Sequence, residues 1–307
     1  MRNRARCHRR LALLACGLVW GLTGGVTSAA ERVVFAENFT ATWCTHCPVV
    51  GRAINNIMTD HPDTFVAIQV HFLDDYVTDF GNTRADFYSI FTLPDVWFDG
   101  LDNMVGDFGD DDQDNYDGFM TYYQARVDIP TPVLLDIEVT PVTGQTYTVT
   151  ADVELESGAD PMRVNLYIAD CLYDYPDYDD NRAHNTVRQG FEIQSLDLNP
   201  GQTVTVQQDV TFDSTSWARQ DDIRIVAWVQ EPALADPAEV YQATSAAYPF
   251  GGVDCPGDVD GDGDVDQSDL GLLLAAYEVD GGGDLDGDGD TDQSDLGILL
   301  AHYEIPC

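Results

Sequence analysis

Two cysteines with a histidine between them are the first residues in this chain whose spacing suggests chemistry. The stretch "TATWCTHCPVV" covers residues 40–50 and contains Cys44, His46 and Cys47. Two thiols at this spacing can exchange a disulfide, form a static disulfide, or supply half of a zinc site. Zinc is disfavoured because no second Cys/His pair stands at a suitable spacing. His61 and His71 are instead expected at a helix end and in a strand.

The first thirty residues are typical of a secretory signal peptide. An apolar run over residues 11–26 is followed by small residues at 28–30, which offer a cleavage site near Ala30. Lipid attachment at Cys16 is the alternative. The basic residues that precede the apolar run are Arg2, Arg4, Arg6, Arg9 and Arg10. We therefore expect an exported bacterial protein without a membrane span, either secreted, periplasmic or at the cell surface. Its cysteines are then disulfide candidates.

The remaining chain is strongly acidic and contains no lysine. Removing the five leader arginines from 14 basic residues leaves 9, so the mature net charge is 9 − 54 = −45. A chain of this charge repels nucleic acids and anionic membranes, which excludes them as partners. The acidic residues either form a solubilising surface or bind calcium, and both uses are expected in different parts of the chain.

The C-terminal part contains two near-identical copies of one motif. Residues 257–279 read "GDVDGDGDVDQSDLGLLLAAYEV", and residues 283–305 repeat this pattern 26 residues later. Aspartate occupies loop positions 1, 3, 5, 7, 9 and 12, and glycine occupies position 6 (Gly263 and Gly289). The twelve aspartates are Asp258, Asp260, Asp262, Asp264, Asp266 and Asp269 in the first copy, and Asp284, Asp286, Asp288, Asp290, Asp292 and Asp295 in the second.

This pattern predicts calcium binding, with about two ions in the repeat. Ca²⁺ takes six to eight oxygen ligands, and a loop that turns alternate carboxylates inward supplies them. Position 7 is expected to ligate through its backbone carbonyl. An apolar helix follows each loop, and the two helices should pack together. A solvated acidic tail is the alternative, but it would need neither the fixed glycines nor the helices.

The repeat resembles a type I dockerin over about 50 residues. The resemblance implies a cohesin-like partner, contacted through positions 10 and 11, which are Gln267–Ser268 and Gln293–Ser294 here. Position 12 is an aspartate rather than the glutamate of EF-hands, and the departure from the dockerin pattern is the short connection over residues 280–283. Cys255 and Cys307 bracket the module, and a disulfide between them would join its ends.

The N-terminal part predicts an alternating α/β unit. The expected order is a strand over 32–39, the cysteine motif, a helix from Pro48, a second strand over 64–72, a strand entered through Leu93–Pro94, and a closing helix over 112–127. This order resembles the thioredoxin fold across about 100 residues, with "WCTHCP" and the later proline as its motif.

The resemblance implies a role for each residue of the motif. Cys44 would be the exposed nucleophile at the helix start, where the helix N-terminus stabilises its thiolate. Cys47 would be the buried resolving thiol, and His46 would make the pair more oxidising. Pro94 would be the cis-proline facing the disulfide, with Leu93 lining the substrate groove. Possible substrates are exported thiol proteins.

One position departs from the thioredoxin pattern. Six residues before Cys44, where that family keeps a buried acid, this chain has Asn38. The neighbouring Glu37 is expected on the other face of the strand. The acidic run over 107–118 could bind another calcium ion, but its register is poor, and a solvated turn with acids at a helix N-terminus is favoured.

The middle part predicts a β-sandwich. After Pro130 and Pro132 the chain alternates apolar and polar residues in short runs, such as "TYTVTADVEL" and "IRIVAWVQ", separated by turn residues. Cys171 is expected to be a buried free thiol and His184 a loop residue. The end of this part, "VQEPALADPAEVYQATSAAYPF", resembles a bacterial outer-membrane-protein-related group in which a thioredoxin-like domain precedes a sandwich.

The sequence therefore predicts a multidomain chain. The expected parts are a signal peptide (1–30), a thioredoxin-like domain (31–129), an all-β sandwich (130–252) and a small α-helical dockerin-like, EF-hand-like module (253–307). Two functions compete: a thiol–disulfide oxidoreductase attached through its calcium module, and a non-enzymatic assembly protein with a structural Cys44–Cys47 disulfide.

Overall fold

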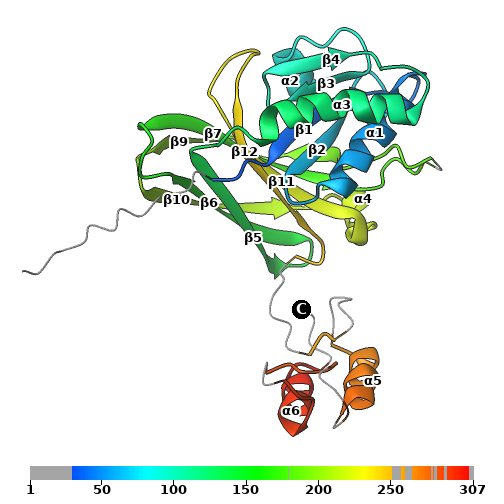
Figure 1. Cartoon of the computed structure of the whole chain (residues 1–307), viewed down its shortest axis with the longest axis vertical. Coiled ribbons are helices and arrows are strands. Elements are labelled where there is room, and N and C mark those ends of the chain that lie inside the picture. The colour runs from blue at the N-terminus through cyan, green and yellow to red at the C-terminus, as the bar shows by residue number, and fades with distance from the viewer. Residues whose placement is uncertain are drawn as a thin grey trace, which may run out of the picture.

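The computed structural model describes residues 30–178, 180–250, 257–259, 265–277, 279, 282–286 and 289–303. The expected signal peptide, Cys255 and Cys307 lie outside these residues, apart from Ala30 at the end of the leader. The described chain is a mixed α/β protein with two sheets, and the C-terminal repeat is a separate pair of helices (Figure 1).

The N-terminal unit follows the predicted order of elements. Strands β1 (Val34–Thr40) and β2 (Phe65–His71) run parallel, and β1 also pairs antiparallel with β3 (Asp95–Phe98). Helices α1 (Cys47–Asp60) and α3 (Asp112–Val127) cover one face of these strands (Figure 1). The remaining elements are α2 (Asp79–Phe87) and β4 (Asp102–Val105). The helix predicted over 112–127 is confirmed to the residue.

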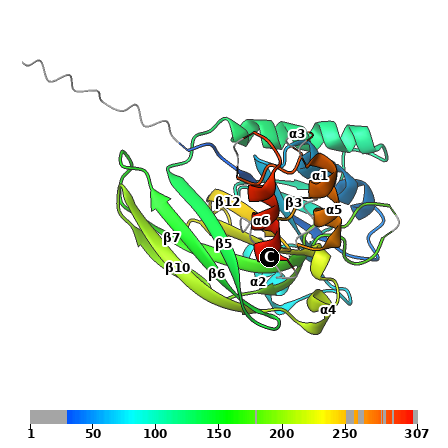
Figure 2. The same cartoon turned by 90° about the horizontal axis from the view of Figure 1, so that it is seen from below.

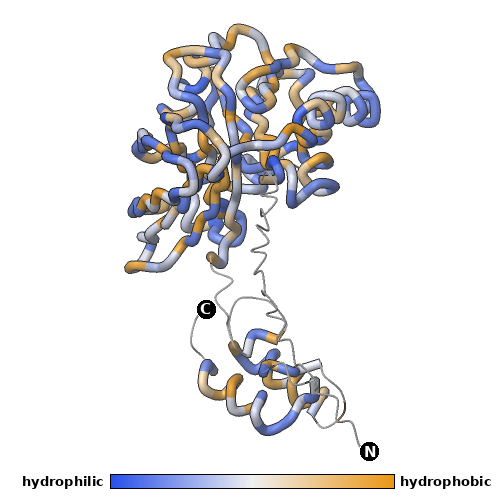
Figure 3. The backbone as a smooth tube through the Cα atoms, turned by 60° about the vertical axis from the view of Figure 1, so that its left-hand side comes forward, coloured by the Kyte–Doolittle hydropathy of each residue, from blue (hydrophilic) through white to orange (hydrophobic). Residues whose placement is uncertain are grey.

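The second unit is a sandwich of two β layers, as predicted. Its outer layer is a three-stranded sheet in the order β10-β6-β5 (Figure 2). Its other layer belongs to the large sheet, and alternating apolar residues of both layers form one core. Figure 3 colours the backbone by the hydropathy of each residue. The strands are β5 (Val133–Thr143), β6 (Thr146–Leu155), β7 (Met162–Leu172), β8 (Thr186–Gly190), β9 (Gln194–Leu198), β10 (Gln202–Thr211), β11 (Ile223–Gln230) and β12 (Val240–Ala247). A short helix, α4 (Ser214–Trp217), precedes β11.

One sheet joins the two units. Its order is β12-β11-β7-β8-β2-β1-β3-β4, and the junction is the parallel pairing of Gln69 in β2 with Thr186 in β8. Strands β7 and β11 bury both faces, because alternate residues enter the sandwich core and a second core shared with β1, β2 and α2. This explains the almost unbroken apolar run of β11. The expected boundary near residue 130 therefore separates two units that share a sheet, and the domain limits stay a prediction.

A buried ion pair connects the two units. Arg84 on α2 donates from Nε and Nη2 to the two carboxylate oxygens of Glu37 on β1, at 2.7 and 2.6 Å. The Tyr88 hydroxyl donates to the same carboxylate, and Arg84 Nη2 also donates to Gln230 Oε1 on β11, at 3.1 Å. Glu37 thus lies on the face of β1 that points away from α1, as was expected.

A second buried cluster connects the same two units. Asp99, which is fully buried, accepts from Arg32 Nη1 at 3.0 Å and from Arg126 Nε at 2.8 Å. Its other oxygen accepts from the Phe35 amide at 2.8 Å. Both arginines also contact Glu239, next to β12. Arg32, Arg84 and Arg126 therefore each have partners on both sides of the junction, and every buried charge in the two clusters is paired, as buried ions require.

The C-terminal repeat forms two helices, α5 (Gln267–Ala276) and α6 (Gln293–His302). They share an apolar cluster centred on Leu273 and Leu299, as the sequence predicted. The first glycine of each copy packs on the helix of the other. A Cβ on Gly257 would lie 3.0 Å from the Leu299 Cα atom, and one on Gly283 would lie 3.1 Å from the Leu273 Cα atom. The two copies are therefore packed reciprocally.

The buried ion pair leads to a stability prediction. Changing Glu37→Gln leaves the Arg84 guanidinium buried without a charged partner, so the free energy of unfolding should fall by about 3–5 kcal/mol. Urea denaturation followed by circular dichroism measures it. The control is Asp197→Asn, which breaks the exposed pair with Arg163 and should leave the unfolding midpoint unchanged. Equal effects of the two substitutions would contradict this account.

Candidate functional site

Cys44 and Cys47 form a disulfide at the start of α1. The S–S distance is 2.05 Å and the Cα–Cα distance is 5.5 Å. The helix begins at Cys47, so Cys44 lies in the preceding turn rather than in the first helical turn as expected. The Cys47 amide nevertheless donates to Cys44 Sγ at 3.1 Å, and the Cys44 amide donates to the Ala41 carbonyl. An N–H group at the helix start, which has no acceptor within the helix, thus points at the sulfur that would carry negative charge after reduction.

The disulfide is more covered than the sequence suggested. Cys44 was expected to be exposed, but it is only 7 % exposed, close to the 4 % of Cys47. Ala41 and Leu93 pack against both sulfur-bearing residues. The Leu93–Pro94 peptide bond is cis, as predicted. The covering residues are Ala41, just before the two cysteines, and Leu93, in the loop before β3. Sequence spacing could not show that these residues would lie over the disulfide.

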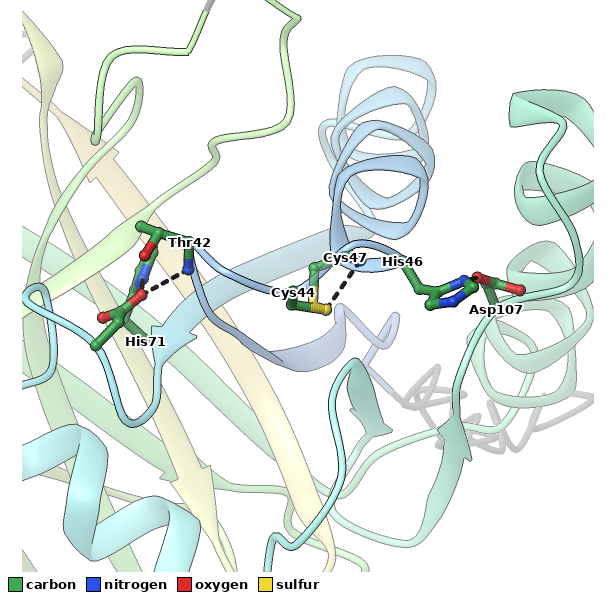
Figure 4. The surroundings of a disulfide bond; sticks show 7 residues. Thr42, Cys44, His46, Cys47, His71 and Asp107 are labelled. Carbon is green, nitrogen blue, oxygen red and sulfur yellow. Dashed lines mark hydrogen bonds and ion pairs between the residues drawn. A yellow bond between two sulfur atoms is a disulfide. The ribbon is translucent and has the colours of Figure 1, made fainter.

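His46 points away from the disulfide (Figure 4). Its Nδ1 lies 2.6 Å from Asp107 Oδ2, in the loop after β4, and most of its ring is exposed. The other Asp107 oxygen accepts from the Gly109 amide at 3.1 Å. Sequence reasoning missed Asp107 as a partner of the motif, although it had noted the acidic run to which Asp107 belongs.

The rest of that acidic run has the structural role that was favoured. Asp111 is the N-cap of α3 and accepts from the Gln113 and Asp114 amides. Asp112 and Asp114 occupy the first turn, where negative charge stabilises a helix.

The turn before Cys44 is held by the loop that follows β2. Asp74 Oδ2 accepts from the Thr42 amide at 2.7 Å and lies 2.6 Å from His71 Nδ1. The Trp43 indole donates to the Leu73 carbonyl at 3.0 Å. His71 is thus a buried strand residue that is paired with Asp74. Through Asp74, which also binds the Thr42 amide, it helps to position the motif. The hydrogen bonds to His71 and Thr42 help to lower the pKa of Asp74, against the opposing effect of burial.

Asn38 lies where thioredoxins keep a buried acid. It is buried in β1 on the same strand face as Val34 and Ala36, which pack in the core beneath α1. Both atoms of its amide group lack a hydrogen-bond partner among the described residues. The strand therefore carries a polar group here but not a titratable one.

Three further residues that the sequence analysis singled out, His61, Cys171 and His184, lie away from the disulfide. His61 caps the C-terminus of α1, as expected of a helix-end residue. Cys171 is a buried free thiol, as expected, and burial raises its pKa. His184 lies in a loop, but it is fully buried, and burial lowers its pKa to about 4.

Exposed apolar side chains belong to the segments around the disulfide. Trp43 is in the motif itself, Leu73 accepts its indole hydrogen bond, and Phe91 lies two residues before Leu93. Phe91 is 91 % exposed, and Trp43 and Leu73 are also exposed. These segments therefore offer apolar surface to a partner.

The second acidic loop brings carboxylates together. Oxygens of Asp284, Asp286 and Asp295 lie within 4.8 Å of one another, and so do those of Asp290, Asp292 and Asp295. Asp290 at loop position 7 places a side-chain oxygen in the second group, and its expected ligation through the backbone carbonyl stays a prediction. Asp260, Asp262, Asp264 and Asp288 lie outside the described residues.

Both loops end in the same arrangement at position 12. Asp295 is buried and accepts from the amides of Asp292 and Leu285, both at 2.7 Å. Asp269 does the same with Asp266 and Val259, at 2.8 and 2.7 Å. Backbone N–H groups, that of Asp292 above all, lower the pKa of Asp295. Asp266 and Asp292 are the N-caps of α5 and α6, and Asp258 begins the first loop. Hard oxygen donors gathered in this way fit the ligand preference of Ca²⁺.

Comparisons with known proteins show the fold but no family. No family model matches the chain, and no curated protein matches its sequence. Among solved structures, HBP35 of Porphyromonas gingivalis has a TM-score of 0.57 and 16 % identity, over 71 % of this chain and 75 % of that one. A protein of Agrobacterium tumefaciens aligns over 71 % of this chain and 95 % of its own, with a TM-score of 0.47 and 16 % identity.

A third solved structure is a domain of the outer membrane lipoprotein Omp28 of P. gingivalis. It covers 38 % of this chain and 89 % of its own, with a TM-score of 0.27 and 16 % identity. Of these structures, HBP35 is the one with which the chain shares its α/β-plus-sandwich fold.

In the part of the chain that the structure describes, no helix is long and apolar enough to cross a bilayer.

Proposed function

We propose that the protein is an exported thiol–disulfide oxidoreductase whose reactive pair is Cys44 and Cys47. The observation that carries this proposal is the hydrogen bond from the Cys47 amide at the start of α1 to Cys44 Sγ. A backbone donor at a helix N-terminus stabilises a thiolate there and makes it a better leaving group. The cover formed by Leu93, next to cis-Pro94, adds the surroundings that the thioredoxin resemblance implies.

The reaction exchanges two electrons between two cysteine pairs. A substrate thiolate attacks Cys44 Sγ, which breaks the Cys44–Cys47 bond, and Cys47 leaves as a thiolate. The second substrate thiolate then attacks the substrate sulfur of the mixed disulfide and releases Cys44 as a thiolate. The substrate dithiol is oxidised to a disulfide, and the enzyme pair is reduced. The reverse direction reduces a substrate disulfide.

The substrate class that we propose is an exported polypeptide. A small disulfide would gain nothing from the exposed apolar side chains of Trp43, Leu73 and Phe91. An unfolded chain with apolar residues beside its cysteines would bury them on binding. Because Cys44 is largely covered, such a substrate must displace Leu93 or approach along its edge.

The first test is insulin reduction with dithiothreitol as the electron source. Cys44→Ser should lower the rate to that of dithiothreitol alone, because the attacking sulfur is lost. The matched control is Cys171→Ala, which removes a buried thiol away from the site and should keep the wild-type rate. Wild-type protein that is no faster than dithiothreitol alone would refute the oxidoreductase proposal.

The competing function is a structural disulfide on a non-enzymatic assembly protein. The burial of both sulfur-bearing residues and the lack of an acid at Asn38 favour it. The reduction potential of the pair separates the two functions. A potential far below about −300 mV would indicate a static structural bridge.

We further propose that the C-terminal repeat binds about two Ca²⁺ ions and attaches the protein to a cohesin-like partner. The convergence of carboxylate oxygens in the second loop supports the first part, since six to eight oxygens satisfy this ion. Reciprocal packing of the copies supports the second part, because it presents two equivalent helices. Leu274 and Leu300, at the same position of each copy, are 53 % and 55 % exposed.

Calcium should stabilise the repeat, since clustered carboxylates repel one another without a cation. Titrating Ca²⁺ into chelator-treated protein should raise helicity, and Asp295→Asn should weaken binding at one of the two sites at least tenfold. Isothermal titration calorimetry measures this loss. Asp110→Asn, which removes an exposed carboxylate elsewhere, is the control and should bind as the wild type does. Helicity that ignores both calcium and chelator would overturn the calcium proposal.

A further inference from the structure

Arg224 is the exception among the arginines of the described chain. The other eight arginines there each place a side-chain nitrogen within 3.1 Å of a carboxylate oxygen. Arg224 contacts no carboxylate at this range. Its Nη1 donates to the backbone carbonyls of Asp221 and Ile223, and its guanidinium lies over the Tyr173 ring at 5.2 Å. In a chain with net charge −40, a cation without an acidic partner is unexpected.

Arg224 also lines a cleft between the two units. The cleft has a volume of about 170 Å³. Arg224 and Ser245 enter it from β11 and β12, while Met58, Phe65 and Val66 enter it from the end of α1 and the start of β2. One side of the cleft is therefore cationic and polar, and the other side is apolar.

A second polar group at this cleft is unsatisfied. Asn185 is 6 % exposed and has a positive φ of 42°, a conformation that costs energy for a residue other than glycine. Its Nδ2 donates to the Ala67 carbonyl at 2.9 Å, but its Oδ1 has no hydrogen-bond partner among the described residues. Asn185, with one acceptor oxygen unpaired, and Arg224, hydrogen-bonded to carbonyls but without an ion pair, therefore line the same cleft.

Burial makes the unpaired arginine costly. It lowers the pKa of Arg224, because the charged form loses hydration and the charge of nearby Asp222, which forms no ion pair with it, only partly compensates. An anion that enters the cleft would restore the missing interaction, as acids do for the other arginines. A guanidinium presents a planar pair of N–H donors that matches a carboxylate.

We propose that this cleft binds a small organic monocarboxylate, with its carboxylate on Arg224 and its apolar group against Met58, Phe65 and Val66. The volume is below the range of about 300–1,000 Å³ typical of drug-sized ligands, so the ligand is a short-chain acid. A single guanidinium in a strongly acidic protein favours a monoanion over the dianionic form of phosphate. The site is separate from the Cys44–Cys47 pair, so the proposal is independent of the redox function.

The experiment is ligand-observed NMR of the full chain with butyrate, butyramide, acetate and inorganic phosphate. Butyrate should bind, its neutral amide should bind at least tenfold more weakly, and acetate should bind more weakly because it lacks the apolar group. Arg224→Gln should weaken butyrate binding at least tenfold. Arg163→Gln, which removes an arginine of an exposed ion pair, should leave it unchanged.

A second variant tests the cleft without removing the charge. Ser245 is exposed on β12, so Ser245→Phe should fill the cleft, keep the fold and abolish butyrate binding. Circular dichroism checks the fold of both variants, and Ser245→Phe decides the question if Arg224→Gln does not fold. Failure of wild type to bind butyrate, equal binding of butyramide, tighter binding of phosphate, or full affinity in Ser245→Phe would each overturn the proposal.

Discussion

The buried ion pair between Glu37 and Arg84 is the constraint on which the arrangement of the two units depends. A guanidinium without water must have its charge and its hydrogen bonds satisfied by protein groups. Glu37 on β1, Tyr88 beside α2 and Gln230 on β11 supply them together. The strand that leads into the cysteine motif is thereby fixed to the sandwich, and the disulfide is carried by both units rather than by one.

The same pairing of arginines with carboxylates extends over the described chain. With very few basic residues, nearly every arginine is held by a carboxylate, and the cluster around Asp99 repeats the principle at a second place on the junction. At the other end of the chain the carboxylates have no arginines, and they converge on one another. The first kind of acid stabilises the fold directly, whereas the second kind is the one for which we propose a cation from solution.

Much of the fold could be predicted because the local pattern and the tertiary environment agree. The 3.6-residue period of α1 and the alternation of β6 are enough to place them. Strands β8, β9 and β12 were not predicted, since β8 and β9 are short and all three carry many polar residues. They exist because neighbouring strands offer unpaired backbone groups, and that information is not local.

The sequence by itself determined the cysteine pair, the cis bond before Pro94, the register of the acidic repeat and the absence of an acid at position 38. These depend on residue type and short-range spacing. Only the tertiary structure decided that His46 turns toward Asp107, that Leu93 covers Cys44, and that Arg224 alone among the described arginines lacks an acid. The physical reason is that burial and charge pairing are set by residues far apart in the sequence, 61 positions for His46 and Asp107, which meet only when the chain folds.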